Sequence, residues 1–566
     1  MSSESGIDDI SSSLIPPVEK TDDDDDDSEQ ESEKIVIDEM LTRYCGEFGL
    51  WQIKHFVLTC SAWALEAFHT MVMIFADREP SWRCLDSSGS GCLLGSNSQS
   101  GSVCDLVPGS WEWIGGSSAS TISEWGLLCG DKYKVGLAQS GFFAGCMVGA
   151  GIFGHLSDSF LGRKGSLTTV CVLNAIFGCL TALSPTYWFY AVLRFLTGLS
   201  TGGVGLCCFV LATEPIGPSA RGAVGMSTFY FFSGGIVMLS GIAYLFQSWR
   251  SLYIASTMPS IIYLVAFLPF ISESPRWYLV RGKVDQAMKV MHNIAKGNGK
   301  KIPTGVILAL DDECNDKNSN EGYSSRAELM LTASASELIQ GPMTRSFQTK
   351  DGTKDAAARG SLIDVIKSPV TRIRLLLTIA INLVTCIVYY GLSLNVVNLK
   401  TNLYISVLIN AVAEMPAFAI TAILLDRFGR KPLAIGTMWF SGIFCLIGSM
   451  VSNSGAGKVL RMFCGVLGIF GMAGTYNLLF IYTAELFPTV VRNAALGCAT
   501  QAAQMGAILA PLVVVMGGGL PFAVFAACGI IGGLFAFYLP ETLNRPLYDT
   551  MAGIEEGEAR IVRDSA

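Results

Sequence analysis

The sequence is poor in charge and in the residues that enzymes use most for catalysis and metal binding. Only 15% of the 566 residues are charged, whereas 51% are hydrophobic. The four histidines, His55, His69, His155 and His292, match no metal-binding spacing such as HExxH. No GxxxxGK[ST] phosphate loop is present. We therefore expect no catalytic residue, metal site, cofactor or nucleic-acid partner, and the composition argues against an ordinary soluble protein.

Long apolar runs dominate the chain instead. Twelve stretches have the length of about 18 or more residues that an α-helix needs to cross a bilayer. They lie near 56–75, 136–157, 166–184, 188–212, 223–245, 251–271, 373–394, 403–425, 433–452, 459–482, 494–516 and 520–539. The predicted fold is an all-α membrane protein with twelve transmembrane helices.

The basic residues predict its orientation. They are concentrated in the long stretch 272–372 and in the loops after the second and eighth runs, at Arg163, Lys164, Arg427, Arg430 and Lys431. Since cytoplasmic loops carry the excess of Lys and Arg, we expect both termini and the central linker to be cytoplasmic. The chain is then a multi-pass protein of the plasma membrane or of an internal membrane such as the vacuole's.

Five segments follow from this arrangement. They are an acidic, disordered tail (1–50), a six-helix half (51–271) with a large outer loop (76–135), a cytoplasmic linker (272–372), a second half (373–540) and a cytoplasmic tail (541–566). The acidic run TDDDDDDSEQESE has no apolar period and predicts disorder. At the start of the linker, PRWYLVRGKVDQAMKVMHNIAKG predicts a helix on the inner membrane face.

The outer loop holds four cysteines, Cys84, Cys92, Cys104 and Cys129. An even number in an oxidising compartment predicts two disulfides, with three possible pairings, and four free thiols are the alternative. The chain contains no N-x-[ST] sequon, so we expect no N-linked glycan.

Several motifs occur twice, at nearly the same offset. GHLSDSFLGRK with Asp158 is matched by LLDRFGRK with Asp426, 268 residues later. Three further matches join Arg194 to Arg461, the pair Glu214 and Arg221 to the pair Glu485 and Arg492, and Glu273 to Glu541. Such a repeat predicts two related halves with a site between them near the middle of the membrane.

These motifs resemble those of a known family. GHLSDSFLGRK is similar to the signature loop of the major facilitator superfamily, and EWGLLCGDKYKVGLAQSGFFAG, FISESPRWYLV and YTAELFPTVVRN resemble its organic cation/carnitine transporter branch. The segment NLYISVLINAVAEMPAFAITAILLDRFGRKPL is most similar to plant members of this branch. The resemblance covers about residues 50–545.

The resemblance implies a lock on the cytoplasmic side. The signature loops would act together with the pairs Glu214/Arg221 and Glu485/Arg492, and a topological role for these charges is the alternative. The expected gating residues are Asp158, Arg163, Lys164, Arg194, Glu214, Arg221, Asp426, Arg427, Arg430, Glu485 and Arg492.

Two carboxylates lie within predicted spans, Glu66 in the first and Glu414 in the eighth. A charge at the centre of a bilayer costs about 2.5–3.5 kcal/mol on insertion scales, so such residues usually face a cavity. Either carboxylate can receive a cationic group or a proton. Glu66 and His69 share one helix face, which allows a proton relay or a plain interhelical hydrogen bond.

The resemblance places Glu414 on the acidic position of an E-x-P motif that lines the central cavity, and Tyr389 and Phe232 on aromatic cavity positions. The chain also departs from animal members of the family. Gln504 stands where they carry an acid or an arginine, Gly202 where cation carriers have a lysine, and Asn382 where many have an aromatic residue. The neutral Gln504 leaves the charge preference of the substrate open.

The function expected from all this is alternating-access transport of small organic cations or zwitterions, such as carnitine, choline-like compounds or polyamines. The carrier would be a monomer in a lipid bilayer, coupled to H⁺ or Na⁺ or to neither. One alternative is a sugar/proton symporter, although IAINLVTCIVYYGLSLN lacks the paired glutamines of sugar carriers on helix 7. Another is a transporter-like receptor that moves no substrate.

Overall fold

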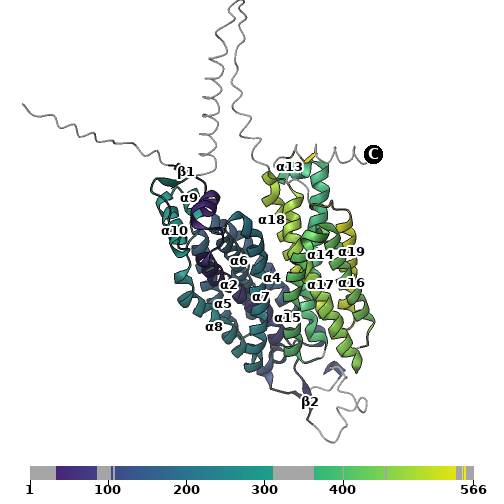
Figure 1. The fold of residues 1–566 in the computed structure, drawn as a ribbon. Helices are drawn as coiled ribbons and strands as arrows, with labels where there is room; N and C mark the ends of the chain where they lie inside the picture. The colour runs from purple at the N-terminus through teal and green to yellow at the C-terminus, as the bar shows by residue number, and fades with distance from the viewer. Residues whose placement is uncertain are drawn as a thin grey trace, which may run out of the picture.

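Twelve helices form two bundles that lie side by side (Figure 1). The computed structural model describes residues 33–85, 103–105, 109–309, 362–399, 401–452, 455–543, 551 and 554–555. Within them, the twelve helices that are long and apolar enough to cross a membrane coincide with the twelve predicted runs. The all-α, twelve-helix prediction is confirmed.

Each half contributes six of these helices. The first half contains α2 (Leu50–Ala76), α4 (Tyr133–Asp158), α5 (Gly162–Ala182), α6 (Tyr187–Thr213), α7 (Pro218–Leu245) and α8 (Trp249–Ala266). The second half contains α14 (Pro369–Leu394), α15 (Leu403–Phe428), α16 (Arg430–Met450), α17 (Ala456–Leu486), α18 (Thr489–Val515) and α19 (Leu520–Phe537).

The two ends of the bundles carry different short elements (Figure 1). One end, which we call the loop face, has β2 (Trp82–Cys84), η2 (Val103–Asp105), β3 (Trp111–Trp113), η3 (Ser117–Ala119), α3 (Thr121–Trp125), η4 (Cys129–Asp131) and η6 (Asn395–Leu399). The other end, the linker face, has β1 (Glu33–Ile35), α1 (Ile37–Met40), the π-helical η1 (Leu41–Cys45), η5 (Leu268–Phe270), α9 (Pro275–Val280), α10 (Val284–Gly297), β4 (Val306–Leu308) and α13 (Leu362–Lys367).

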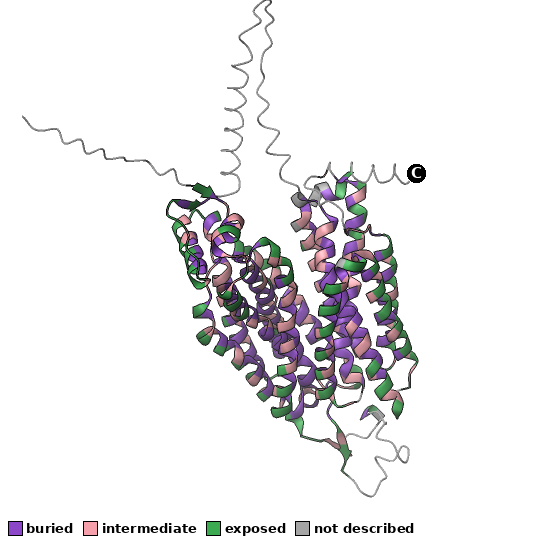
Figure 2. Cartoon of the chain, in the orientation of Figure 1, coloured by how far each residue is buried: buried purple, intermediate pink, exposed green. Residues whose placement is uncertain are grey.

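The outer surface of the bundles is apolar, as a bilayer requires. Figure 2 shows exposed residues along the outward faces of the helices and buried ones between them. Val265, Leu376 and Phe463 are among the large apolar side chains that are more than half exposed. Prolines occur inside α8, α15 and α18, where membrane helices tolerate them because neighbouring groups satisfy the freed carbonyls.

Glycines bring α4 and α6 into backbone contact. A Cβ atom at Gly145 or Gly149 would overlap the backbone of α6, and one at Gly198 or Gly202 would overlap the backbone of α4. Small residues four apart permit this close approach in membranes. Gly202 therefore faces a neighbouring helix at a distance that leaves no room for a larger side chain.

The loop face is stapled by a disulfide. Cys104 and Cys129 are joined, with their Cα atoms 5.7 Å apart. Cys84 is also disulfide-bonded, and Cys92 lies outside the described residues. Strands β2 and β3 pair in antiparallel register, with Cys84 opposite Trp111.

A buried carboxylate anchors this loop to the first half. Asp77, at the end of α2, accepts hydrogen bonds from Thr121 Oγ1 of α3 (2.7 Å), Gln139 Nε2 of α4 (3.1 Å) and Tyr190 OH of α6 (2.8 Å). Glu124 of α3 pairs with Arg250 and accepts from Trp249 Nε1 at 2.7 Å. The loop segment around α3 is therefore part of the folded bundle.

At the linker face, part of the predicted disordered tail is structured. Strand β1 pairs in parallel with β4, and Ile35, Ile37 and Met40 pack in one apolar cluster with Met291 and Ile294 of α10. The rest of the acidic run, up to residue 32, lies outside the described residues. The helix predicted for this part of the linker exists as α9 and α10, but the apolar face of α10 covers the N-terminal segment, so it is used for protein packing.

The disulfide can be tested by peptide mapping without reduction. We expect a cross-linked peptide pair containing Cys104 and Cys129, because the loop has brought their Cα atoms within bonding range. Reduction before digestion is the control and should separate the two peptides. Alkylation of both cysteines in unreduced protein would contradict the assignment.

Candidate functional site

A buried carboxylate lies where the two halves meet. Glu414, near the middle of α15, is only 1% exposed. Its Oε2 atom accepts a hydrogen bond from Ser233 Oγ of α7 at 2.6 Å and one from Tyr389 OH of α14 at 3.3 Å. The Ser233 contact joins the first half to the second at the depth where a charge is most costly.

Aromatic rings surround this carboxylate. Tyr389 stacks on Tyr476 of α17, with ring centroids 5.4 Å apart, and also contacts Tyr390 at 5.2 Å. Phe229 of α7 contacts Tyr476 at 5.9 Å and Phe418 of α15 at 6.0 Å. The site therefore combines one acid with ring faces from both halves, which is the chemistry that recognises quaternary and other organic ammonium groups.

A small cavity adjoins Glu414 on the side toward the loop face. Besides Glu414, its walls are Met71 and Ile74 of α2, Ile236 of α7, Ser393 of α14, and Val407, Asn410 and Ala411 of α15. The walls are mainly apolar, so the carboxylate is the dominant charge that this cavity presents.

The second buried acid has a different environment. Glu66 Oε2 is buried and has no hydrogen-bond partner among the described residues. It lies against Gly205 of α6 and close enough to Tyr390 and Tyr476 to interact with them electrostatically. Glu66 thus lies near the same aromatic group that surrounds Glu414.

His69 belongs to another environment. Its Nε2 atom lies 3.3 Å from Ser260 Oγ of α8, and its carbonyl accepts from Arg194 Nη2 at 3.0 Å. The imidazole also lies beside Gly178 of α5. The histidine therefore makes an interhelical hydrogen bond within the first half.

The remaining predicted cavity residues are dispersed. Phe232 is buried against Trp63 of α2, at 6.4 Å between ring centroids. Asn382 donates to the carbonyl of Thr378 in its own helix at 2.9 Å, two turns from Tyr389 on the same face. Gln504 is half-buried, one turn from Ile508, whose carbonyl accepts from Ser140 of α4. Gln504 therefore lies on the α18 face that meets the first half.

Near the loop face, Tyr404 joins the halves. The hydroxyl of Tyr404 in α15 accepts from Arg78 at 2.5 Å, and its ring contacts Phe75 at 5.6 Å and Tyr244 at 5.8 Å. Nearer the linker face, the halves meet through aromatic rings, with Phe209 of α6 6.3 Å from Phe480 of α17. The loop-face contact is thus polar and aromatic, and the contact nearer the linker face is aromatic.

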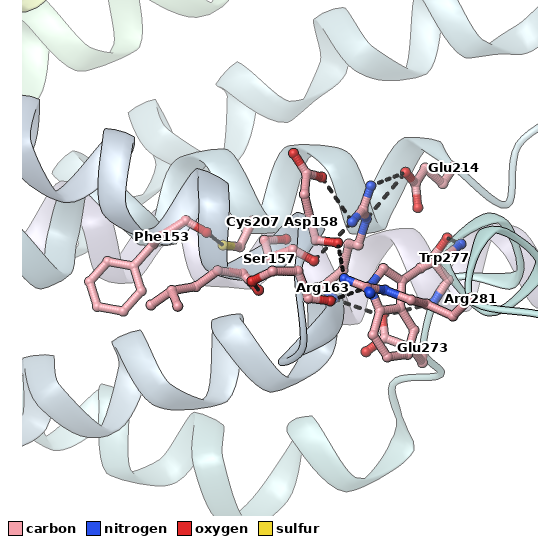
Figure 3. Close-up of polar contacts among 12 residues, drawn as sticks. Phe153, Ser157, Asp158, Arg163, Cys207, Glu214, Glu273, Trp277 and Arg281 are labelled. Carbon is pink, nitrogen blue, oxygen red and sulfur yellow. Dashed lines mark hydrogen bonds and ion pairs between the residues drawn. The ribbon is translucent and has the colours of Figure 1, made fainter.

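The signature loop of the first half forms an ion-pair cluster (Figure 3). The Arg163 guanidinium lies between the carboxylates of Asp158 (2.9 Å) and Glu214 (3.2 Å). The expected partner of Glu214, Arg221, instead binds Asp38 of α1 at 2.6 Å and the carbonyl of Ile216. The predicted Glu214/Arg221 pair is wrong, because Arg221 faces the N-terminal segment.

The second half repeats this arrangement. Arg430 pairs with Glu485 at 2.9 Å, so the predicted Glu485/Arg492 pair is also wrong. Two nitrogens of Arg492 are buried without a hydrogen-bond partner in the described part of the chain. The Arg427 side chain is exposed, and the side chain of Asp426 lies outside the described residues.

A carboxylate caps one helix in each half. Glu273 accepts from the backbone N–H groups of Arg163 (3.0 Å) and Lys164 (3.1 Å), and Glu541 accepts from those of Arg430 (2.9 Å) and Lys431 (3.0 Å). An anion at a helix N-terminus is stabilised by these free donors.

Positive φ angles let the chain turn beneath each cap, at Gly162 (75°) and Gly429 (88°). The two carboxyls differ in burial. Burial raises the pKa of Glu273 above its ordinary value, whereas at Glu541 burial also raises it but the backbone donors outweigh that effect and the net pKa is lowered.

Arg194 does not belong to a lock at the linker face. It lies two turns from the loop-face end of α6, is 1% exposed, and stacks on Phe142 with its guanidinium carbon 4.3 Å from the ring centroid. The prediction that Arg194 belongs to a cytoplasmic lock is therefore wrong. The helix α6 runs from the loop face to the linker face, and the motif RFLTG lies near its loop-face end.

The family described as "Sugar (and other) transporter" matches residues 94–552. The chain is 66% identical to organic cation/carnitine transporter 4 of Arabidopsis thaliana, over 94% of this chain and 93% of that one. It is 30% identical to an organic cation transporter protein of Drosophila melanogaster, over 92% and 94% of the two chains. The chain belongs to the organic cation/carnitine transporter family.

The fold is that of the major facilitator superfamily. The xylose transporter XylE from E. coli, in a partially occluded inward-open conformation, superposes with a TM-score of 0.58 at 15% identity. The match covers 88% of this chain and 100% of XylE. In this member of the organic cation/carnitine transporter family, the buried acid therefore lies between the halves of a transporter fold.

Sequence reasoning missed the serine that binds Glu414. Ser233 directly follows the predicted cavity residue Phe232, in the run FFSGG. A serine in an apolar helix commonly bonds a carbonyl of its own helix, as Ser240 does with Ile236. The sequence gives no sign that Ser233 contacts another helix, and Tyr476 likewise stands in no motif that was recognised.

A double-mutant cycle tests the revised pairing at the linker face. We expect the free energies of unfolding of Arg163→Gln, Glu214→Gln and the double variant to be non-additive by about 0.5–3 kcal/mol, because the two residues form one ion pair. The matched cycle with Arg221→Gln and Glu214→Gln should be additive. Coupling in the second cycle but not in the first would restore the original Glu214/Arg221 pair.

Proposed function

We propose that this chain transports small organic cations or zwitterions by alternating access, with Glu414 as the carboxylate that binds the cationic group. The observation that carries the proposal is the hydrogen bond from Ser233 to Glu414 across the two halves. The named substrates of the Arabidopsis and Drosophila relatives agree with this chemistry. Carnitine, choline-like compounds and polyamines are the substrates to test.

The geometry supports cation binding because Glu414 is a buried acid in an apolar, aromatic setting. In such a setting a carboxylate and a cation attract each other more strongly than in water. Tyr389 and Tyr476 provide ring faces beside the acid, and each ring can add about 0.5–2 kcal/mol by cation-π attraction. A sugar has no charge to exploit this arrangement.

In this proposal Glu414 takes part both in substrate binding and in the contact between the halves. A cation that approaches Glu414 competes with the Ser233 hydroxyl, which forms a hydrogen bond between the halves at this depth. Substrate binding would therefore replace a contact between α7 and α15 by contacts to the substrate. Binding of the substrate at this site would therefore change the contacts that hold the two halves together.

Glu66 is the candidate for proton coupling. Its buried oxygen lacks a hydrogen-bond partner among the described residues, so it can take up a proton without losing a contact. His69 is the second candidate, through its hydrogen bond to Ser260. The alternative for Glu66 is a second contact with cationic cargo, and Na⁺ remains an alternative coupling ion.

The same proposal places the linker face in the cytoplasm, with both termini, and the disulfide-bearing loop face outside or in a lumen. The basic residues of the linker and signature loops support this orientation. Oxidising conditions at the loop face agree with the Cys104–Cys129 disulfide. The carrier would act as a monomer in the plasma or vacuolar membrane.

Glu414→Gln tests the central assignment. A hydrogen bond to a charged group contributes roughly 1.5–3 kcal/mol, so we expect uptake of a subsaturating cation to fall about 10- to 100-fold. The assay is uptake by purified protein in liposomes with carnitine, choline, putrescine and xylose, with and without a pH gradient. The matched control is Glu79→Gln, at an exposed acid of the loop face. Unchanged cation uptake by folded Glu414→Gln would refute the role.

Gln504→Asp tests what sets the charge preference. A second acid on the face of α18 that meets the first half should favour simple cations over zwitterions, because it repels the carboxylate of carnitine. We expect the choline-to-carnitine uptake ratio to rise about tenfold, the equivalent of about 1.4 kcal/mol. Gln504→Asn is the control for shortening the side chain. An identical ratio in both variants would exclude Gln504 from selectivity.

A further inference from the structure

Among the three basic side chains in the signature loop of the second half, Arg427 is the exposed one. Arg427 is exposed, whereas Arg430 pairs with Glu485 and the Lys431 ammonium lies over the Phe537 ring at 5.0 Å. The corresponding position of the first half is Ser159. Arg427 is therefore a feature of one half alone.

An apolar groove of about 360 Å³ runs along the same helix. Its walls come from α15, α16 and α17 and include Ala417, Leu424, Phe428, Gly436, Phe440 and Phe470. Phe428 is 64% exposed and Phe440 36%, so the groove opens toward the bilayer. Its volume lies within the range of roughly 300–1,000 Å³ that is typical of small-molecule sites.

Arg427 stands at the linker-face end of this groove. Along α15 the groove residues Ala417, Ile420 and Leu424 follow each other at spacings of three and four, and Arg427 comes three residues after Leu424. Residues at these spacings share one helix face. Arg427 therefore lies at the linker-face end of an apolar channel, next to the groove residue Phe428.

We propose that this groove binds one anionic phospholipid, with an acyl chain between α15, α16 and α17 and the headgroup phosphate at Arg427. The apolar walls alone would not select a lipid, because other acyl chains of the bilayer are equally apolar. Selection comes from the charge, since a basic residue near a membrane surface attracts anionic lipids. In the orientation proposed above, that surface is the cytoplasmic leaflet.

The groove and Glu414 share the helix α15. Every α15 residue that lines it comes after Pro416, which lies inside the helix two residues after Glu414. Proline removes one backbone hydrogen bond and weakens a helix at that point. A lipid in the groove would hold the part of α15 between Pro416 and the linker face, and so keep Glu414 in position. The lipid is a positioning ligand for transport.

Two substitutions test the site from different sides. Arg427→Gln removes the charge, and Gly436→Leu fills the groove, since a Cβ at Gly436 would have open space around it. The matched controls are Arg372→Gln, an exposed basic residue of the linker face, and Gly241→Leu, an exposed glycine of α7 that also has open space. Each protein is placed in phosphatidylcholine vesicles with and without phosphatidylglycerol.

The first readout is lipid retained on the purified protein, measured by native mass spectrometry. We expect wild type and both controls to retain phosphatidylglycerol about fivefold over phosphatidylcholine, and Arg427→Gln and Gly436→Leu to lose that preference. The second readout is cation uptake, which phosphatidylglycerol should raise several-fold in wild type and in the controls only.

Equal retention by Arg427→Gln, or an equal loss in Arg372→Gln, would overturn the proposal, because the preference would then come from the general surface charge. Stimulation of uptake by soluble inorganic phosphate in place of phosphatidylglycerol would overturn it as well. Lipid retention does not depend on transport, so failure of the proposed substrate class leaves this test intact.

Discussion

The structure depends on one constraint, which is the cost of placing the Glu414 carboxylate near the middle of a membrane without partners. Glu414 finds them in Ser233 of the other half and in Tyr389 of its own half. Only the contact between α7 and α15 brings Ser233 within reach, so the requirement of the acid is met by the arrangement of the two bundles. The buried acid of one half is thereby hydrogen-bonded to the other half.

The sequence repeat explains why the two halves have the same helix caps at the linker face, and comparison of the repeats shows where the halves differ. Glu273 and Glu541 cap equivalent helices above equivalent glycines, which is why motifs 268 residues apart have the same geometry. The N-terminal segment breaks this symmetry, since Asp38 binds both Arg221 and Arg276 of the first half. The first half is thus tied to the linker and the N-terminal segment, and the second half offers an exposed Arg427.

The twelve long helices could be predicted from the sequence because an apolar run of membrane-spanning length nearly always forms a transmembrane helix. The sequence was insufficient for the ion pairs. Glu214 and Arg221 are seven residues apart in sequence, but α7 begins between them and turns Arg221 toward Asp38. Glu414 could be predicted from the cost of a buried charge together with its place in the E-x-P motif, whereas Ser233 was missed because a hydroxyl can always bond its own helix.

The contacts between the halves suggest an order for their separation. Near the loop face, Arg78 and Tyr404 form a polar bond within an aromatic group, whereas toward the linker face Phe209 and Phe480 touch only through their rings. Ring contacts can slide without leaving a donor unpaired, but a buried hydrogen bond must be replaced when it breaks. Among the described contacts, separating Phe209 from Phe480 therefore costs less than breaking the bond between Arg78 and Tyr404. In the transport mechanism that we propose, a cation that replaces Ser233 at Glu414 would supply part of the free energy for this second separation.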